Sequence, residues 1–465
     1  MDNQKMSAKV VLAVIAAGIM SFAGVVIETS MNITFPTLMR EFGINTSTVQ
    51  WMTTIYLLVV SIIIPLSAIL KRGFKTKHLF IAANLLFILG IILDIVAPSF
   101  SFLLLGRVVQ GLGTGIALPL MFNIILEQVP LSKIGLMMGV GNLITAIAPA
   151  VGPTFGGLVV SSMGWRYIFV LLLPLLILSL FIGLFSIEQK SEVNKVNFDI
   201  MSLLWIVVTF VGLVIGFSSM GSGQIMSVKV IFPIVIGIVG MILLYHRSTH
   251  SDNPVINLNV LKNRSFAGHV LVFFILQFET LGLSFILPNY IQIVNNKSAT
   301  IAGLIVLPGA VIGAFFAPFS GKILDNFGPK PPMLSGIGFG LLALILFVAF
   351  GMHLNDSLIL VFYIIYMLCI GLSFGNFMTN GLKHLKQTEN SDGNAVLTTI
   401  QQISGAISTS IISAIITLSQ VSHNNLGEVK STALGSQNAL IVLLILMIVA
   451  VGFTFKLLLF KKNAK

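Results

Sequence analysis

The sequence predicts an all-α integral membrane protein with fourteen transmembrane helices, arranged as two six-helix bundles with two further helices inserted between them. Three observations predict this class. Hydrophobic residues make up 56% of the 465 residues and charged residues only 9%, whereas soluble domains carry about 25% charged residues. The mean hydropathy is +1.02. Apolar stretches recur along the whole chain, and each is about as long as the roughly 20 residues that a helix needs to cross a bilayer.

The composition also excludes other classes of protein. A chain so poor in polar residues cannot coat a water-facing surface, which excludes a soluble globular protein and a disordered one. The single cysteine, Cys369, excludes a disulfide framework and a thiolate metal cluster. The apolar stretches are continuous and do not alternate with polar residues, which excludes a β-barrel.

The apolar stretches define the predicted spans in chain order. They cover residues 10–33, 48–70, 78–98, 101–125, 134–162, 166–187, 199–220, 228–246, 267–292, 301–323, 332–352, 357–382, 395–419 and 437–460. The first stretch could be a signal peptide, but it is too long for one, lacks a small-residue cleavage site and carries Glu28. No connection between spans is long enough for a soluble domain, so we expect the function to reside within the membrane.

Basic residues predict the orientation of the spans, because cytoplasmic loops are enriched in Lys and Arg. With both termini in the cytoplasm, most of the 26 Lys and Arg fall inside and few fall outside. The outside set is Arg40, Arg166, Lys229, Lys297 and Lys430. The net charge of +11 is therefore interpreted as a topology signal and not as a nucleic-acid-binding surface.

An internal repeat supports the division into two bundles. Glu28-Thr29 in the first span resembles Glu279-Thr280 in the ninth, and Pro36 and Pro288 follow the two pairs at similar distances. Basic cytoplasmic loops follow the second span of each half. We therefore predict an N-terminal six-helix bundle over residues 1–190, inserted helices over 191–250 and a C-terminal bundle over 251–465, with a site between the halves near the membrane midplane.

Several motifs resemble one transporter family. Residues 107–115 read Arg-Val-Val-Gln-Gly-Leu-Gly-Thr-Gly and resemble the helix-four motif of the major facilitator superfamily. Residues 148–157 read Ala-Pro-Ala-Val-Gly-Pro-Thr-Phe-Gly-Gly and resemble the helix-five motif of its antiporters. With fourteen spans, the chain resembles the fourteen-helix drug:proton antiporters of the EmrB/QacA type. The resemblance implies the major facilitator fold, the exchange of drugs for protons and a coupling role for Arg107.

The resemblance is incomplete in the loop between the second and third spans. That loop usually carries an acid in a Gly-x-x-x-Asp-Arg pattern, but here Ser67 and Lys71 stand near those places without one. The corresponding loop of the second half keeps Gly321 and Asp325. We therefore expect a cytoplasmic latch to depend mainly on the second half.

Charged residues within the spans are the candidate coupling groups. Glu28, Asp94 and Glu279 are the acids and Arg107 is the base. A charge at the centre of a span costs about 2.5–3.5 kcal/mol on insertion scales, so it persists mainly where it faces a cavity or a partner. Burial favours the neutral form of a carboxyl group, which can take up a proton and release it when water arrives. The alternatives are structural ion pairs, such as one between Arg107 and Asp94, and snorkelling of Asp94 to the interface.

The remaining candidates are glycines, prolines and amides within the spans. Small residues let helices approach closely and proline bends a helix, so the run with Pro149, Gly152, Pro153, Gly156 and Gly157 is a candidate gating element. The amides could line the substrate cavity or only bond a neighbouring helix. They are Asn32, Gln277, Asn376, Asn380, Gln401 and Gln402.

Together these features predict a secondary transporter that exports hydrophobic or cationic drugs in exchange for protons by alternating access. By resemblance it is a monomeric antibiotic-resistance protein of the plasma membrane, surrounded by lipid and without a nucleic-acid partner. The proton gradient supplies the energy, and no cofactor, metal site or catalytic residue is predicted. Export of a lipid, a fatty acid or a tetracycline–metal complex is the alternative on the same scaffold. A channel and an integral membrane enzyme are more distant alternatives, and no ATP-binding loop occurs.

Overall fold

A computed structural model describes residues 7–44, 46–49, 51–190, 192–193, 199–220, 227–251, 254–297 and 299–458 of the chain. All regular elements within these ranges are helices. The first nine are α1 (Ala8–Met31), α2 (Phe35–Phe42), α3 (Thr46–Val49), α4 (Trp51–Gly73), α5 (Thr76–Ile95), α6 (Phe100–Gln128), α7 (Ile134–Ser162), α8 (Arg166–Ser186) and α9 (Ile200–Met220).

The later helices follow in the same manner. They are α10 (Val228–His250), α11 (Arg264–Asn289), α12 (Ala299–Phe327), α13 (Lys330–Phe350), α14 (Asp356–Cys369), α15 (Gly375–Leu382), α16 (Asn390–Ser422) and α17 (Gly427–Leu458). Short 3-10 turns join some of them, and π-helical turns continue α11 over Tyr290–Val294 and α14 over Ile370–Phe374. Single π-turns inside helices often mark functional positions.

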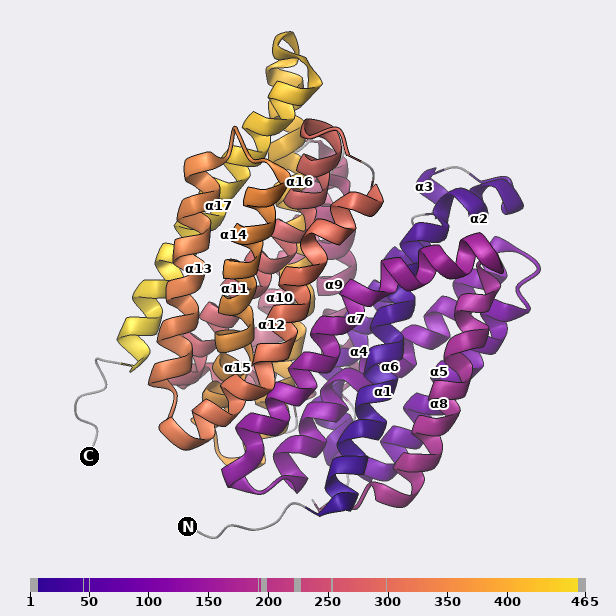
Figure 1. Ribbon diagram of the computed structural model, residues 1–465. Coiled ribbons are helices and arrows are strands. Elements are labelled where there is room, and N and C mark those ends of the chain that lie inside the picture. The colour runs from indigo at the N-terminus through magenta and orange to yellow at the C-terminus, as the bar shows by residue number, and fades with distance from the viewer. Residues whose placement is uncertain are drawn as a thin grey trace. The chain divides into compact units, whose positions relative to one another are not determined.

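Fourteen helical segments in the described ranges are long and apolar enough to cross a bilayer, which confirms the predicted number of spans. The observed ends of the spans differ most from the predicted ones at the last two spans. The predicted spans 395–419 and 437–460 leave residues 420–436 as a polar connection. In the structure α16 continues to Ser422 and α17 starts at Gly427, and the two form a helical hairpin in Figure 1. Hydropathy marks the part of a helix that meets lipid, and it carries no signal where a helix continues into water.

Contacts between residues divide the chain into two compact units. Unit 1 comprises Met1–Ile206, Arg247–Asn257 and Thr388–Thr398, and unit 2 comprises Val207–His246, Leu258–Gln387 and Thr399–Lys465. The helices α9, α10 and α16 therefore contribute residues to both units. The division of the sequence at residues 190 and 250 stays a prediction.

Polar caps start several of the helices that carry the candidate residues. The Ser99 side chain accepts a hydrogen bond from the backbone of Phe102 at the start of α6, and Asn355 does the same for Leu358 at the start of α14. Asn263 caps α11. Each cap satisfies a backbone donor that has no partner within the helix.

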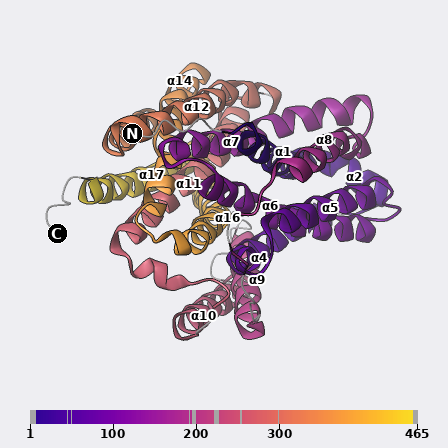
Figure 2. The same cartoon turned by 90° about the horizontal axis from the view of Figure 1, so that it is seen from below.

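Helix α6 packs against α1, α4 and α5 within unit 1 (Figures 1 and 2). Its glycines permit close packing: an added Cβ at Gly113 would lie 2.7 Å from the carbonyl oxygen of Ala83 on α5. At Gly111 and Gly115 it would lie 2.9 Å or less from Val59 or Ile63 on α4. The helix-four glycines therefore bring α6 against its neighbours.

Candidate functional site

Arg107 lies at the centre of a buried polar network in unit 1. Its side chain is 0% exposed, and the guanidinium carbon stands 4.1 Å from the centroid of the Tyr56 ring. The Nη1 atom donates a hydrogen bond to Gln110 at 2.7 Å, and Nε donates one to the Met52 carbonyl at 3.3 Å. Arg107 is thus held by a cation–π contact and two directed hydrogen bonds.

Asp94 joins this network through Gln110. The Gln110 amide donates a hydrogen bond to Asp94 Oδ2 at 2.6 Å and accepts one from Arg107. Asp94 is fully buried on α5, so it does not snorkel to the interface. An added Cβ at Gly106 would lie 1.9 Å from Asp94 Oδ1, so glycine at this position makes room for the carboxylate. Asp94 and Arg107 are therefore bridged by an amide and form no direct ion pair in the described part of unit 1.

Glu28 lies on α1 and is partly exposed, unlike the other three candidate charges. Arg107 and Tyr56 are near enough to act on it electrostatically. The Tyr56 hydroxyl lies 3.1 Å from the Gly24 carbonyl and 3.0 Å from Thr114 Oγ1. One buried network therefore ties α1 to α4 and α6 at the level of Glu28.

Glu279 occupies a different environment in unit 2. Its side chain on α11 is 0% exposed. The hydroxyl of Tyr366 lies 3.4 Å from Oε2, and Oε1 has no hydrogen-bond partner among the described residues. The carboxyl therefore faces a phenol, in contrast to the first-half acids, which lie near an arginine.

The glycines of the motif at residues 148–157 lie on α7, where it crosses α1 within unit 1. The Ser30 hydroxyl donates a hydrogen bond to the Gly152 carbonyl at 2.7 Å. An added Cβ at Gly152 would lie 1.8 Å from Thr29 Oγ1, and one at Gly156 would lie 2.9 Å from the Cα of Ser30. By contrast, a Cβ at Gly157 would meet nothing within 4 Å. Gly152 and Gly156 thus set the distance between the two helices.

Three further candidates remain, namely Pro149, Pro153 and Asn32. Pro149 is exposed on α7. The side chains of Pro153 and Asn32 lie outside the described part of the structure, although both residues belong to helical segments.

Two of the predicted cavity amides bond neighbouring helices of unit 2. Asn376 donates a hydrogen bond to Ser320 Oγ on α12 at 2.6 Å and, within its own helical segment, to the Leu372 carbonyl at 2.7 Å. The Asn380 amide nitrogen lies 2.8 Å from Nε2 of the buried His269. The side chains of Gln277, Gln401 and Gln402 are partly exposed.

In unit 1, the basic residues at the end of α4 pair with acids from other helices, although the loop after α4 lacks the acid that the family pattern carries. Lys71 Nζ lies 2.9 Å from Glu127 on α6 and donates a hydrogen bond to Thr76 at 2.6 Å. Arg72 Nη1 lies 3.7 Å from Asp392 at the start of α16, and Nη2 donates to the Pro254 carbonyl at 2.6 Å.

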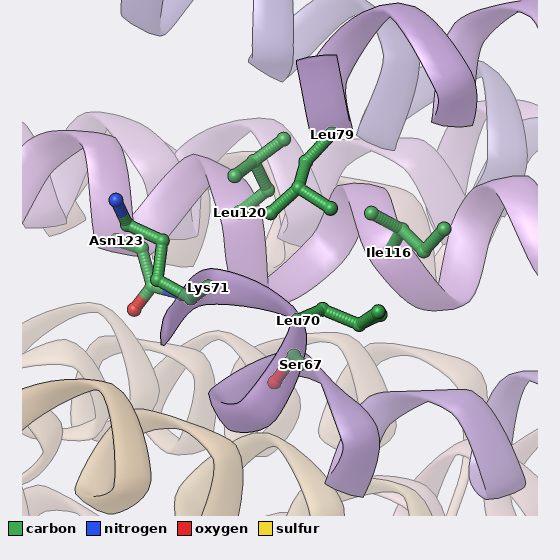
Figure 3. A pocket seen from close by; sticks show the side chains of 7 residues that line it. All are labelled: Ser67, Leu70, Lys71, Leu79, Ile116, Leu120 and Asn123. Carbon is green, nitrogen blue, oxygen red and sulfur yellow. The ribbon is translucent and has the colours of Figure 1, made fainter. Parts of the chain in front are cut away.

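A small pocket adjoins this charged cluster. Its lining comes from the end of α4, the start of α5 and the second half of α6, as Figure 3 shows. The lining residues are Ser67, Leu70, Lys71, Leu79, Ile116, Leu120 and Asn123. The Asn123 amide oxygen, in turn, accepts a hydrogen bond from Asn394 on α16 at 2.8 Å. Polar groups of α4, α6 and the start of α16 therefore meet within unit 1.

In unit 2, the end of α12 forms an ion pair with the residue that follows α15. Asp325 lies 4.0 Å from Lys383, and its carboxylate side chain is 4% exposed. Gly321 is buried on α12 one turn earlier. Ion pairs therefore lie near the ends of both α4 and α12. A cytoplasmic latch that depends mainly on the second half stays a prediction.

A third cluster stands at the opposite end of unit 1 from the start of α1, near α2 in Figure 1. Glu41 accepts hydrogen bonds from Trp165 Nε1 and Arg166 Nη1, both at 2.7 Å. Partial burial alone would raise the pKa of Glu41, but the hydrogen bonds from Trp165 and Arg166 and the Arg166 charge lower it below its usual value. The cluster fastens α2 to the start of α8.

Sequence reasoning missed Tyr56, Gln110, Tyr366 and Asp392, which complete these clusters. Gln110 lies within the helix-four motif, three residues after Arg107, where side chains share a helix face, so spacing could have found it. The two tyrosines and Asp392 are brought to their partners only by the fold.

The match to a known family decides between a transporter and an enzyme. The family model described as Major Facilitator Superfamily matches residues 13–409 of this chain. The chain belongs to the major facilitator superfamily. It is accordingly a multi-pass membrane transporter and not an enzyme.

Relatives of this superfamily member include resistance proteins. It is 36% identical to the lincomycin resistance protein LmrB of Bacillus subtilis over 427 residues, which cover 91% of this chain and 89% of that one. It is 27% identical to a multidrug resistance protein B homolog of Mycobacterium tuberculosis, over 86% of this chain and 74% of that one.

Solved structures share the fold of this superfamily member. The human organic anion transporter MFSD10 superposes with a TM-score of 0.67 at 11% identity, covering 95% of this chain and 100% of that one. The proton:xylose symporter XylE gives the same TM-score at 14% identity, covering 97% and 96%. These similarities show the major facilitator fold.

Proposed function

We propose that this transporter exports hydrophobic or cationic antimicrobial compounds from the cytoplasm in exchange for protons. It would act as a monomer in the plasma membrane, with both termini in the cytoplasm, and the proton gradient would be its energy source. The names of the LmrB and multidrug resistance relatives support drug export. Alternating access between two bundles is the mechanism that parallel repeats of this kind support.

The environment of Glu279 is the observation that carries proton coupling. The carboxyl is fully buried on a membrane helix, and its described hydrogen-bond partner is a neutral phenol. Placing a charge there costs about 2.5–3.5 kcal/mol or more. The carboxylate would thus persist only while water or a cationic substrate accompanies it, and would otherwise take up a proton.

Glu28 would act as the more accessible acid of the pair. It is partly exposed and has the Arg107 charge nearby, so its charged form has a compensating partner that Glu279 lacks. A cationic substrate would therefore compete with Arg107 at Glu28 and with a proton at Glu279. Asp94 would hold Arg107 in place through Gln110.

An efflux panel in a host without its own drug pumps tests this proposal. The arms are lincomycin, the cationic dye ethidium, tetracycline and a labelled fatty acid, each with and without a proton uncoupler. We expect the chain to lower the accumulation of lincomycin or ethidium, and the uncoupler and Glu279→Gln to abolish this effect. Export that survives the uncoupler while cellular ATP is maintained would contradict proton exchange. Export of tetracycline or fatty acid alone would replace the proposed substrate class.

A further inference from the structure

The hydroxyl group of Tyr366 faces three possible acceptors within unit 2. It lies 3.4 Å from Glu279 Oε2, 3.3 Å from the Leu276 carbonyl and 3.2 Å from Thr280 Oγ1. All three belong to α11, whereas Tyr366 lies on α14. Tyr366 is buried, so water does not supply further partners from bulk solvent.

Counting hydrogens shows that this hydroxyl cannot serve all three acceptors at once. A phenol carries a single hydrogen. Thr280 Oγ1 already donates its own hydrogen to the Leu276 carbonyl at 2.7 Å. The Tyr366 hydroxyl can therefore donate its hydrogen either to the Glu279 carboxylate or to the Leu276 and Thr280 oxygens.

The choice depends on whether Glu279 carries a proton. An ionised carboxylate only accepts hydrogen bonds, so the Tyr366 hydrogen would turn toward Oε2. A protonated carboxyl can donate its own hydrogen to the phenol oxygen, which frees the Tyr366 hydrogen for Leu276 or Thr280. In both states the contact between the two groups is kept and only its direction reverses.

We propose that Tyr366 is a positioning residue whose hydroxyl rotates with the protonation state of Glu279 and so keeps that carboxyl hydrogen-bonded in both states. This inference rests on the proposed function only in assigning Glu279 to the coupling proton. Without the hydroxyl, the charged form would lose the donor that the structure describes for it, whereas the neutral form would lose a weaker partner. Tyr366 therefore favours the release of the proton from Glu279.

The other titratable groups acting on this pair are few. Within the described residues, Cys369, Tyr363 and Glu279 act on Tyr366, and Glu279 acts on Cys369. Cys369, Tyr363 and Tyr366 lie on α14, and Glu279 lies on α11. The Cys369 thiol is buried beside Ser373, whose hydroxyl donates to the Cys369 carbonyl at 2.6 Å. No charged side chain of α11, α12, α16 or α17 is among the groups that act on Glu279 in the described chain.

Among the described residues of unit 1, the acid near a tyrosine is placed differently. Tyr56 also lies near an acid, but its hydroxyl lies against Gly24 and Thr114 and its ring contacts Arg107. The charge of Glu28 is balanced by an arginine and that of Glu279 by a reorienting hydroxyl. The two halves would therefore handle their protons by different means.

The test measures the protonation of Glu279 without a transport substrate. Dicyclohexylcarbodiimide reacts with protonated carboxyl groups in apolar surroundings, and peptide mass spectrometry reports the labelling of Glu279 against pH in purified full-length protein. We expect Tyr366→Phe to extend labelling to more alkaline pH by up to about one unit, because 3.4 Å is long for a hydrogen bond to a charged group and such a bond contributes less than a short one. Tyr363→Phe is the matched control: it is also buried on α14, but its hydroxyl bonds Ser284.

A second variant keeps the proposal testable if Tyr366→Phe does not fold. Incorporating 3-fluorotyrosine at position 366 makes the hydroxyl a stronger donor without changing its shape greatly, so labelling should withdraw to more acidic pH. Identical profiles for Tyr366→Phe and the unmodified protein, or an equal shift in Tyr363→Phe, would overturn the proposal. Uncoupler-sensitive efflux in Glu279→Gln would instead overturn the coupling role and leave the labelling result intact.

Discussion

Arg107 shows at the scale of a single residue why one cation can be tolerated inside a membrane helix. Its plane stacks on Tyr56, and two of its N–H groups are directed at Gln110 and Met52. A lysine keeps the charge but has neither the plane nor the fixed fork of donors. The geometry, and not only the charge, therefore specifies arginine.

We expect Arg107→Lys to lower proton-driven efflux by about tenfold or more, because losing even one charged hydrogen bond costs about 1.5–3 kcal/mol. Efflux of lincomycin or ethidium from energised cells, normalised to the amount of protein in the membrane, measures the effect. Arg40→Lys is the control, since Arg40 is exposed on α2. Equal efflux in both variants would show that charge alone suffices at position 107.

At the scale of elements, two helix pairs can be tested, and the first is the crossing of α1 and α7. An added Cβ at Gly156 would press on the Cα and carbonyl oxygen of Ser30, each 2.9 Å away, and backbone atoms cannot rotate aside. We expect Gly156→Ala to destabilise the protein by about 1–3 kcal/mol and to reduce efflux. Gly157→Ala should be at least as stable as the unmodified protein, because its Cβ would meet nothing within 4 Å and alanine favours a helix more than glycine does. Thermal unfolding of the two purified variants in one detergent makes the comparison, and equal stability would mean that α7 shifts freely.

The second pair is α4 with the start of α16, which Arg72 and Asp392 join in unit 1. Breaking a buried pair costs up to about 3–5 kcal/mol, and less here because the Arg72 side chain is 31% exposed. We expect Arg72→Asp and Asp392→Arg each to impair efflux, and the double swap to restore part of it. Restoration should be incomplete, since Arg72 also donates to the Pro254 carbonyl and Asp392 also accepts from the Asn257 backbone. A double variant as impaired as the worse single variant would show that the attraction between the charges is immaterial.

For the whole molecule, hydropathy predicts which segments lie in the membrane and which lie in water. The fourteen spans follow from it, as do Glu28, Arg107 and Glu279, which stand out as charges in apolar surroundings. The partners do not follow, because Tyr366 lies 87 residues from Glu279 in sequence and carries no charge that would mark it. Asp392 does not follow for a different reason: it lies outside the apolar stretch 395–419, in the first turn of α16, which begins before that stretch.

The orientation of the whole chain remains a prediction from its basic residues, and the single native cysteine makes it easy to test. Cys369 is buried, so a membrane-impermeant maleimide should leave the unmodified protein unlabelled on intact cells. Lys430 and Lys322 are both exposed, but they are predicted to lie outside and inside the cell. We therefore expect Lys430→Cys to be labelled on intact cells and Lys322→Cys only after the cells are opened. The reverse pattern would place both termini outside the cell. Protons entering the cell would then approach Glu28 and Glu279 from the cytoplasmic end that the export proposal assigns to these helices.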